Sequence, residues 1–179
     1  FEIAEKIEVP ALVHALEPAF VPWATPFEPW LLHQLAGHEK FVGGKISTLD
    51  EPHFLYWASM CRDLGLDFVP HSGDDFGIAS AIRMGLPLLI GAGVSACPLI
   101  CAAKKYWKKE DFDSRVYKLF EALQSLEDSV FRLDDKGSAA GYKHSTAEIL
   151  KMLDIIDSAE IHPACPDLRS GDEQARMRE

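Results

Sequence analysis

The 179-residue sequence has few cysteines and no paired-cysteine motif. Cys61, Cys97, Cys101 and Cys165 form no Cys-x-x-Cys pair, so neither a disulfide framework nor a zinc ribbon is indicated. We interpret all four as buried, reduced thiols, which suits a cytoplasmic protein. The sequence opens at Phe1 with no initiator methionine and no basic-then-apolar leader, and we therefore expect no signal peptide.

Positive charge is also scarce, since 18 Lys and Arg residues face 28 Asp and Glu residues, for a formal net charge of −10. The negative electrostatic field of such a chain repels a phosphate backbone or an anionic membrane surface, so neither nucleic acid nor a membrane is an expected partner. Residues 84–103 carry no charge and would be long enough to span a bilayer. Pro87, Gly91, Gly93 and Pro98 interrupt this segment, which favours a short strand, a turn and the start of a helix.

Apolar strand-like segments alternate with amphipathic helical segments along most of the chain. With 47% hydrophobic and 26% charged residues, the chain can bury a sizeable core. We predict one domain at 1–157, followed by a polar C-terminal tail at 158–179. The predicted strands are 10–14, 41–47, 67–73 and 86–90, and the predicted helices are 2–7, 30–36, 50–64, 74–84, 96–109, 111–133 and 138–154.

Four successive strand–helix units predict an α/β fold with a parallel sheet covered by helices. Such units can build a small open, doubly wound sheet. They can also build half of an eight-stranded barrel, which usually needs about 250 residues. The pattern of elements alone does not separate these two architectures.

Lys45 is unusual because it lies inside an apolar strand segment, 41–47, directly after two glycines. Desolvation at such a position lowers the pKa of a lysine, so that a fraction of neutral amine is present near neutral pH. A neutral amine can attack a ketone and form an imine. The alternative is a lysine at a strand end whose ammonium group reaches solvent.

Three segments occur in an order and spacing that resemble a known family. They are Phe-Val-Gly-Gly-Lys45-Ile-Ser, Ser72-Gly-Asp-Asp and Leu-Leu-Ile90-Gly-Ala-Gly-Val-Ser. Together they resemble the dihydrodipicolinate synthase and N-acetylneuraminate lyase family of Schiff-base aldolases. The resemblance implies a (β/α)8 TIM barrel, of which this chain covers roughly the second half, with four β-α units and the C-terminal helices. It also implies a homo-oligomer.

By this resemblance, Lys45 is the residue that forms a Schiff base with pyruvate or another 2-oxo acid, without any cofactor or metal. Gly73 and Ile90 match positions that line the family's pocket, and Ser47 is a candidate polar contact to substrate. His14 stands where the family has a tyrosine that relays protons. An imidazole can transfer protons near neutral pH, so His14 is the candidate acid or base.

The function predicted on this basis is that of a lyase, meaning an aldolase, a synthase or a dehydratase. The alternative is a catalytically silent relative, or a truncated barrel half that acts as a binding or assembly module. His71, Asp74 and Asp75 are also candidate ligands for a divalent metal ion. Because the two aspartates precede a predicted helix, we interpret them instead as residues that cap its free N–H groups.

Overall fold

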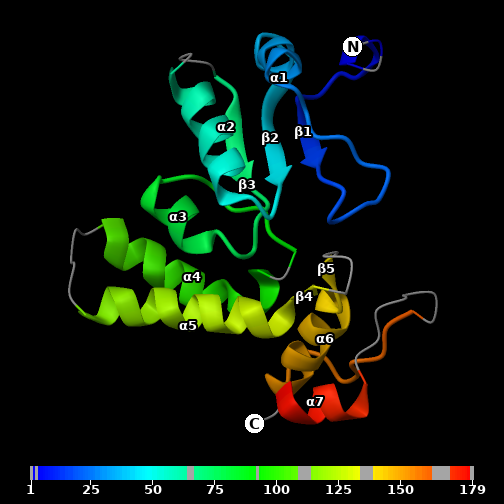
Figure 1. Ribbon diagram of the computed structural model, residues 1–179, viewed down its shortest axis with the longest axis vertical. Helices are drawn as coiled ribbons and strands as arrows, with labels where there is room; N and C mark the ends of the chain where they lie inside the picture. Colours follow the sequence, from blue (N-terminus) through cyan, green and yellow to red (C-terminus); the bar gives the residue numbers. More distant parts are fainter. Residues whose placement is uncertain are drawn as a thin grey trace. The chain divides into compact units, whose positions relative to one another are not determined.

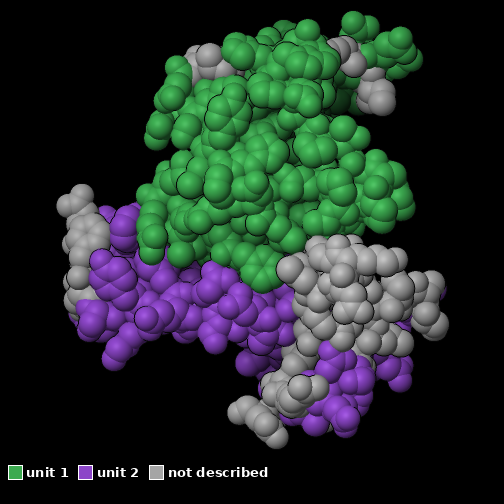
Figure 2. Space-filling model, in the orientation of Figure 1, with its two compact units in different colours: residues 1–89 green, residues 90–179 purple. Residues whose placement is uncertain are grey.

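The computed structural model divides into two compact units, residues 1–89 and residues 90–179 (Figure 2). The predicted boundary between residues 157 and 158 stays a prediction. The structure describes residues 2, 4–63, 67–91, 93–108, 114–133, 139–162 and 170–177.

The first unit is built on a three-stranded parallel sheet (Figure 1). Its strands β1 (Ala11–Leu16), β2 (Phe41–Ser47) and β3 (Val69–Ser72) lie in the order in which they occur in the sequence. These strands confirm the first three predicted segments, and β2 has the predicted bounds. The other elements of this unit are the 3₁₀ helix η1 (Ala4–Lys6) and the helices α1 (Pro29–Ala36), α2 (Glu51–Asp63) and α3 (Ile78–Arg83).

The core of this unit lies between one face of the sheet and the helices. Since successive side chains of a strand point to opposite faces, Val13, Ala15 and Ile46 share this face. The predicted apolar stripe of α2 is buried, which confirms its assignment as an amphipathic helix. The buried cluster consists of Ala15, Leu32, Ile46, Phe54, Trp57, Cys61, Phe68 and Ala81.

The opposite face of the sheet carries the polar side chains, and we call it the lysine face. Leu12 and Val69 on this face are 51% and 44% exposed. None of the three strands contains an acidic residue. The lysine face consists of Leu12, His14 and Leu16 of β1, Gly43, Lys45 and Ser47 of β2, and Val69 and His71 of β3.

The predicted fourth strand, 86–90, is wrong as a strand. Only one parallel bridge forms, between Ser72 and Leu88. The N–H of Ser72 donates to the carbonyl of Pro87 at 2.9 Å, and the N–H of Leu89 donates to the carbonyl of Ser72 at 2.8 Å. The ladder stops there because β3 ends at Ser72 and because Pro87 has no N–H to donate.

The predicted helix 74–84 begins later than expected, because Asp74 holds a turn instead of a helix N-terminus. One carboxylate oxygen of Asp74 accepts the N–H of Phe76 at 2.9 Å. Helix α3 then starts at Ile78, and its N-cap residue, Gly77, offers no side chain for capping. The capping role predicted for Asp74 is therefore wrong, since its carboxylate bonds to the turn before the helix.

The second unit is helical, with one short antiparallel pair, β4 (Arg132–Leu133) and β5 (Ala139–Ala140). Pro98 lies inside its first helix, α4. No helix among the described residues is long and apolar enough to cross a membrane. Its helices are α4 (Gly93–Lys108), α5 (Ser114–Val130), α6 (Tyr142–Met152) and α7 (Gly171–Met177), and α7 falls in the predicted polar tail.

The prediction of buried thiols is confirmed for Cys61 and wrong for two other cysteines. Cys97 and Cys101 are exposed and unpaired by disulfide. They lie one turn apart on α4, whose buried side is formed by other residues, among them Ala96 and Ile100. Cys165 lies outside the described residues.

Candidate functional site

Parallel pairing of the three strands places three basic side chains in one row across the lysine face. His14 of β1 is the register partner of Lys45, and Lys45 is the register partner of His71 of β3. Neighbouring strands lie about 4.8 Å apart, so the backbone of each histidine lies beside that of the lysine. All three residues are candidates on sequence grounds, and the register aligns them.

His14 and Ser47 form a hydrogen bond beside the lysine. Nε2 of His14 lies 2.9 Å from Oγ of Ser47. Ser47 is buried and lies two residues after Lys45 on the same strand, so the two side chains share the lysine face. Two of the predicted site residues are thus in direct contact, and Lys45 shares their face of the sheet.

Gly73 lies against the lysine side chain. Its N–H donates to the carbonyl of Ile46 at 2.7 Å, which fixes its backbone beside β2. A Cβ atom at this position would lie 2.6 Å from Cε of Lys45, 2.6 Å from Oγ of Ser47 and 2.8 Å from the carbonyl oxygen of Ile46. Only glycine leaves enough space for the lysine here. The structure therefore brings Gly73 together with Lys45, Ser47 and His14.

His14 has an altered basicity. Partial burial of the imidazole, and secondly the positive charge of Lys45, lower the pKa of His14 below its usual value of 6.5. A lowered pKa keeps the imidazole neutral at neutral pH. In that state one ring nitrogen has a free electron pair and can accept a proton.

Asp74, the residue after Gly73 in the chain, is a buried carboxyl group with a raised pKa. Burial raises the pKa of Asp74 to about 6, against the opposing effect of backbone hydrogen bonds from Phe76 and Gly77. The nearby charges of Asp75 and Glu51 raise this pKa further. Asp74 is 2% exposed, so its ionised form is held in a poorly solvated turn.

The raised pKa of Asp74 predicts a pH-dependent stability. The pKa of this carboxyl group is higher in the folded state than in the unfolded state. Its contribution to stability is therefore fully present at pH values below the unfolded-state pKa, and it is lost as the pH rises through about 6. Between pH 4.5 and pH 7.5 the wild type is expected to lose about 2 kcal/mol relative to Asp74→Asn. Urea unfolding at the two pH values measures this difference.

Asp63→Asn, which alters an exposed carboxylate at the end of α2, is the control for this comparison. It is expected to leave the dependence of stability on pH as in the wild type. An Asp74→Asn chain whose stability follows the wild-type pH profile would contradict the assignment.

Ile90 belongs to the second unit. Its side chain is partly buried, and its Cγ1 would lie 2.6 Å from a Cβ atom placed on Gly93. Gly93 is the first residue of α4, so Ile90 packs against the start of this helix. Its predicted role in lining a substrate pocket stays a prediction.

Sequence reasoning missed a hydrogen-bonded chain that joins the segment after β1 to helix α2. Nδ1 of His53 lies 2.8 Å from Oε1 of Glu17, and Nε1–H of Trp57 donates to Nε2 of His53 at 2.9 Å. Because Nε2 accepts, Nδ1 carries the proton and donates to Glu17. The ring of Phe27 lies 6.0 Å from the ring of Trp57, so both ends of the segment 17–28 contact α2. Glu17 and His53 are 36 residues apart, and no local motif marks their contact.

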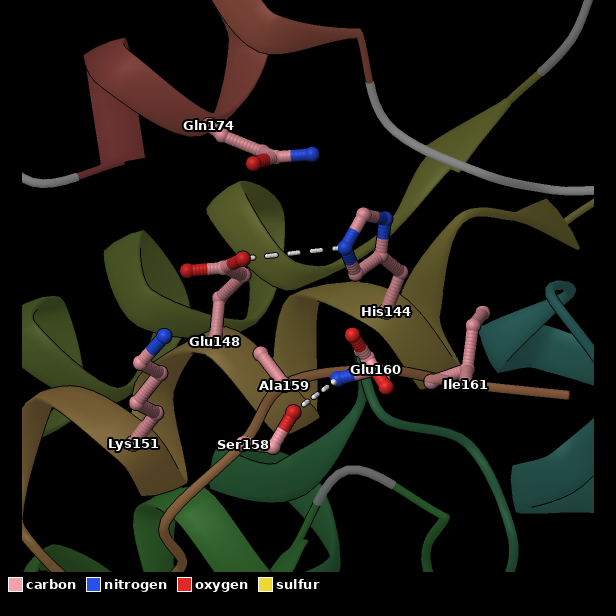
Figure 3. A pocket seen from close by; sticks show the side chains of 8 residues that line it. All are labelled: His144, Glu148, Lys151, Ser158, Ala159, Glu160, Ile161 and Gln174. Carbon is pink, nitrogen blue, oxygen red and sulfur yellow. Dashed lines mark hydrogen bonds and ion pairs between the residues drawn. The ribbon is translucent and has the colours of Figure 1, made fainter.

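The second unit contains a separate cavity of about 520 Å³ (Figure 3). His144 and Glu148 of α6 face each other across one helical turn, with Nε2 and Oε1 3.6 Å apart. None of the predicted site residues lines this cavity. Its lining residues are His144, Glu148, Lys151, Ser158, Ala159, Glu160, Ile161 and Gln174.

The three residues considered for a metal site do not converge. Nδ1 of His71 bonds to the carbonyl of Val69 at 3.0 Å, while Asp74 bonds to the turn that follows it. Among the residues that the structure describes, no three His, Cys, Asp or Glu side chains are grouped so as to hold a metal ion.

Comparison with known proteins gives matches in structure but not in sequence. No protein-family model and no curated protein matches the sequence. Three of the similar solved structures are enzymes. A dihydrodipicolinate synthase from Bacteroides thetaiotaomicron is 17% identical, with a TM-score of 0.77 over 98% of this chain and 58% of its own. A dihydrodipicolinate synthase from Acinetobacter baumannii, complexed with pyruvate, is 18% identical, with a TM-score of 0.73 over 99% of this chain and 56% of its own. A 2-keto-3-deoxygluconate aldolase from Sulfolobus, complexed with D-KDPG, is 15% identical, with a TM-score of 0.70 over 98% of this chain and 54% of its own.

These likenesses show the fold. The chain has the fold of part of a (β/α)8 barrel and spans about half the length of the solved chains that it matches. They confirm the predicted resemblance to dihydrodipicolinate synthases and aldolases at the level of the fold. They also decide between the two architectures left open by the pattern of elements, in favour of the partial barrel.

Proposed function

We propose that this chain carries the imine-forming part of a class I lyase that acts on pyruvate or another 2-oxo acid through Lys45. The observation that carries the proposal is the packing of Cε of Lys45 against Gly73, next to the hydrogen-bonded pair of His14 and Ser47. This arrangement positions an amine, a proton acceptor and a hydroxyl group on one face of a parallel sheet. Chemistry in barrel enzymes gathers at the carboxyl ends of the strands, where these residues lie.

The chemistry needs an amine and a source and acceptor of protons. The lysine nitrogen attacks the carbonyl carbon, a C–N bond forms and the π electrons of the carbonyl move to its oxygen. Protonation of that oxygen lets it leave as water, and an iminium ion remains. The iminium withdraws electrons from the neighbouring carbon, so that a C–C or C–H bond there can break with its electron pair held in an enamine.

We assign proton transfer to His14 and a polar contact to Ser47. The lowered pKa of His14 leaves its imidazole neutral near pH 7, as an acceptor for a proton lost by the substrate. The hydroxyl of Ser47 fixes the orientation of the ring through Nε2. Gly73 gives the lysine its space.

The compared structures support a 2-oxo acid as the substrate class. One of them holds pyruvate and another holds D-KDPG. We also propose that the protein is cytoplasmic, because its described cysteines are free thiols. We propose a homo-oligomer on the basis of the family resemblance.

Reductive trapping tests this proposal. The chain is incubated with pyruvate and borohydride, and the adduct is located by intact-mass and peptide mass spectrometry. We expect one reduced pyruvate adduct on Lys45, none in Lys45→Ala, and an unchanged yield in Lys40→Ala, which removes the lysine that precedes β2. An adduct spread over several lysines, or no adduct in a folded sample, would contradict the proposal.

A binding or assembly module is the second candidate, favoured by the exposed apolar side chains of the lysine face. Under this alternative the folded chain has the barrel-type sheet but does not react with pyruvate. The trapping experiment therefore separates the two candidates, since a module without imine chemistry forms no adduct on Lys45.

A further inference from the structure

We propose that the two exposed thiols of helix α4, Cys97 and Cys101, form a two-coordinate surface site for Cu(I), in which both sulfur atoms bind one ion. This inference goes beyond the proposed function and does not depend on it. The two cysteines lie four residues apart on α4 in the second unit, whereas Lys45 belongs to the first unit.

Exposure separates these two thiols from the cysteine that serves the core. Cys61 is buried in the apolar cluster of the first unit, where it acts as a small apolar side chain. Cys97 and Cys101 are exposed, while Ala96 and Ile100 belong to the buried side of α4. What this surface offers is therefore the chemistry of two sulfur atoms and not their apolar volume.

The spacing of the two cysteines brings their side chains together. Residues four apart on an α-helix lie on the same face, with Cβ atoms about 5–6 Å apart. A hydrogen bond with the side chain of Cys101, and secondly the charge of Cys101, raise the pKa of the Cys97 thiol above its usual value. The two thiols thus interact through a proton, and a metal ion can take the place of that proton between them.

The geometry of a helix favours an ion between the two sulfur atoms over a disulfide. The Cβ atoms of a disulfide lie about 3.5–4.5 Å apart, which is closer than a regular helix places the Cβ atoms of residues four apart. An ion bound between two sulfur atoms spans the larger separation, so α4 can keep its helical backbone.

The donor set determines which ion fits. Thiolates are soft ligands that select Cu(I), Zn²⁺ and iron–sulfur clusters. Structural zinc sites and iron–sulfur clusters are typically held by four protein ligands. Among the residues that the structure describes, no three His, Cys, Asp or Glu side chains are grouped to hold a metal ion, so the pair has no further ligand of these types there. Two thiolates are a sufficient set for Cu(I), which is therefore the ion that we assign.

The charges of α4 favour the complex. One Cu(I) ion bound by two thiolates carries a single negative charge. Helix α4 contains no acidic residue, and Lys105 follows Cys101 by four residues, exposed on the same side of the helix. An ammonium group one turn away stabilises this negative charge.

The binding step exchanges protons for the ion and changes no oxidation state. Cys97 and Cys101 each release one proton to solvent, two Cu–S bonds form, and the copper stays monovalent. Because the ligands must lose their protons, the affinity for Cu(I) rises with pH.

Transfer of Cu(I) from its bicinchoninate complex tests the site. The reduced chain is titrated into the coloured complex without oxygen, and the loss of absorbance measures the copper transferred. We expect one Cu(I) per chain in the wild type. Cys97→Ser and Cys101→Ser should each bind about 10²–10⁴-fold more weakly, because the second sulfur binds in an intramolecular step. The wild-type affinity should rise by at least about 10-fold per pH unit between about pH 6 and pH 8.

Three further variants separate the pair from the mere number of thiols. Cys61→Ala and Cys165→Ser each remove one other cysteine and should leave the affinity for Cu(I) at its wild-type value. Cys101→Ser combined with Ala102→Cys keeps four cysteines but places the second thiol five residues after Cys97, on a different face of α4. This double variant should bind as weakly as the two single-serine variants.

Each outcome decides the inference. A wild-type affinity no higher than that of the single-serine variants would overturn it, and so would a double variant that binds as tightly as the wild type. Copper held between two chains, seen as a doubled mass in sedimentation, would also overturn it. Circular dichroism of each variant shows whether a lost affinity reflects a lost fold.

Discussion

Gly73→Ala is expected to slow formation of the pyruvate adduct on Lys45 by at least about 10²-fold. The added Cβ would lie 2.6 Å from Cε of Lys45 and 2.8 Å from the carbonyl oxygen of Ile46. The carbonyl belongs to a paired strand and cannot move far, so the lysine side chain must leave its position. We also expect a loss of about 1–3 kcal/mol of stability from overpacking. Trapping kinetics and urea unfolding measure the two effects separately.

The same substitution at Gly171 is the control, because nothing lies within 4 Å of a Cβ atom placed there. Gly171→Ala should leave both the rate and the stability near their wild-type values. If Gly73→Ala folds and reacts at the wild-type rate, then Gly73 does not determine the position of Lys45. Circular dichroism of each variant shows whether a lost rate reflects a lost fold.

Trp57→Ala is expected to destabilise the chain by about 3–5 kcal/mol, as measured by urea unfolding. Trp57 is among the largest fully buried side chains and belongs to the core between the sheet and α2. Its removal leaves a cavity. It also removes the hydrogen bond that the indole N–H donates to Nε2 of His53. Trp57→Phe keeps most of the apolar volume and loses this hydrogen bond, so we expect a cost of about 1–2 kcal/mol.

Trp23→Ala serves as the comparison, because Trp23 is 84% exposed and lies in the segment between β1 and α1. It should change the stability by less than about 0.5 kcal/mol. Equal losses in Trp57→Ala and Trp23→Ala would show that the core described for the first unit does not control its stability.

Much of the first unit could be predicted from local sequence. The segment 41–47 is apolar on both sides of a lysine and ends before a helix start, so its bounds as β2 followed from the sequence. The burial of Phe54, Trp57, Ala58 and Cys61 followed from their helical spacing. The family resemblance added which residues share the site, and the structure brings His14, Ser47 and Gly73 together around Lys45.

Other features depend on long-range pairing, which local patterns do not encode. The segment 86–90 has the composition of a strand, but a strand also needs a partner long enough to pair with, and β3 ends after Ser72. The exposure of Cys97 depends on which side of α4 the rest of its unit covers. The register that places His71 beside Lys45 is set by backbone pairing between β2 and β3, 26 positions apart in the sequence.

The attachment of residues 17–28 to α2 at both ends has a consequence for how such a protein can diversify. Glu17 bonds to His53 at one end, and Phe27 packs near Trp57 at the other, so both ends of the stretch are anchored to α2. Surface segments tolerate substitutions and short insertions better than the elements they connect, so we expect such changes between these anchors to leave the sheet and the core in place. Selection can therefore act on this stretch independently of the fold.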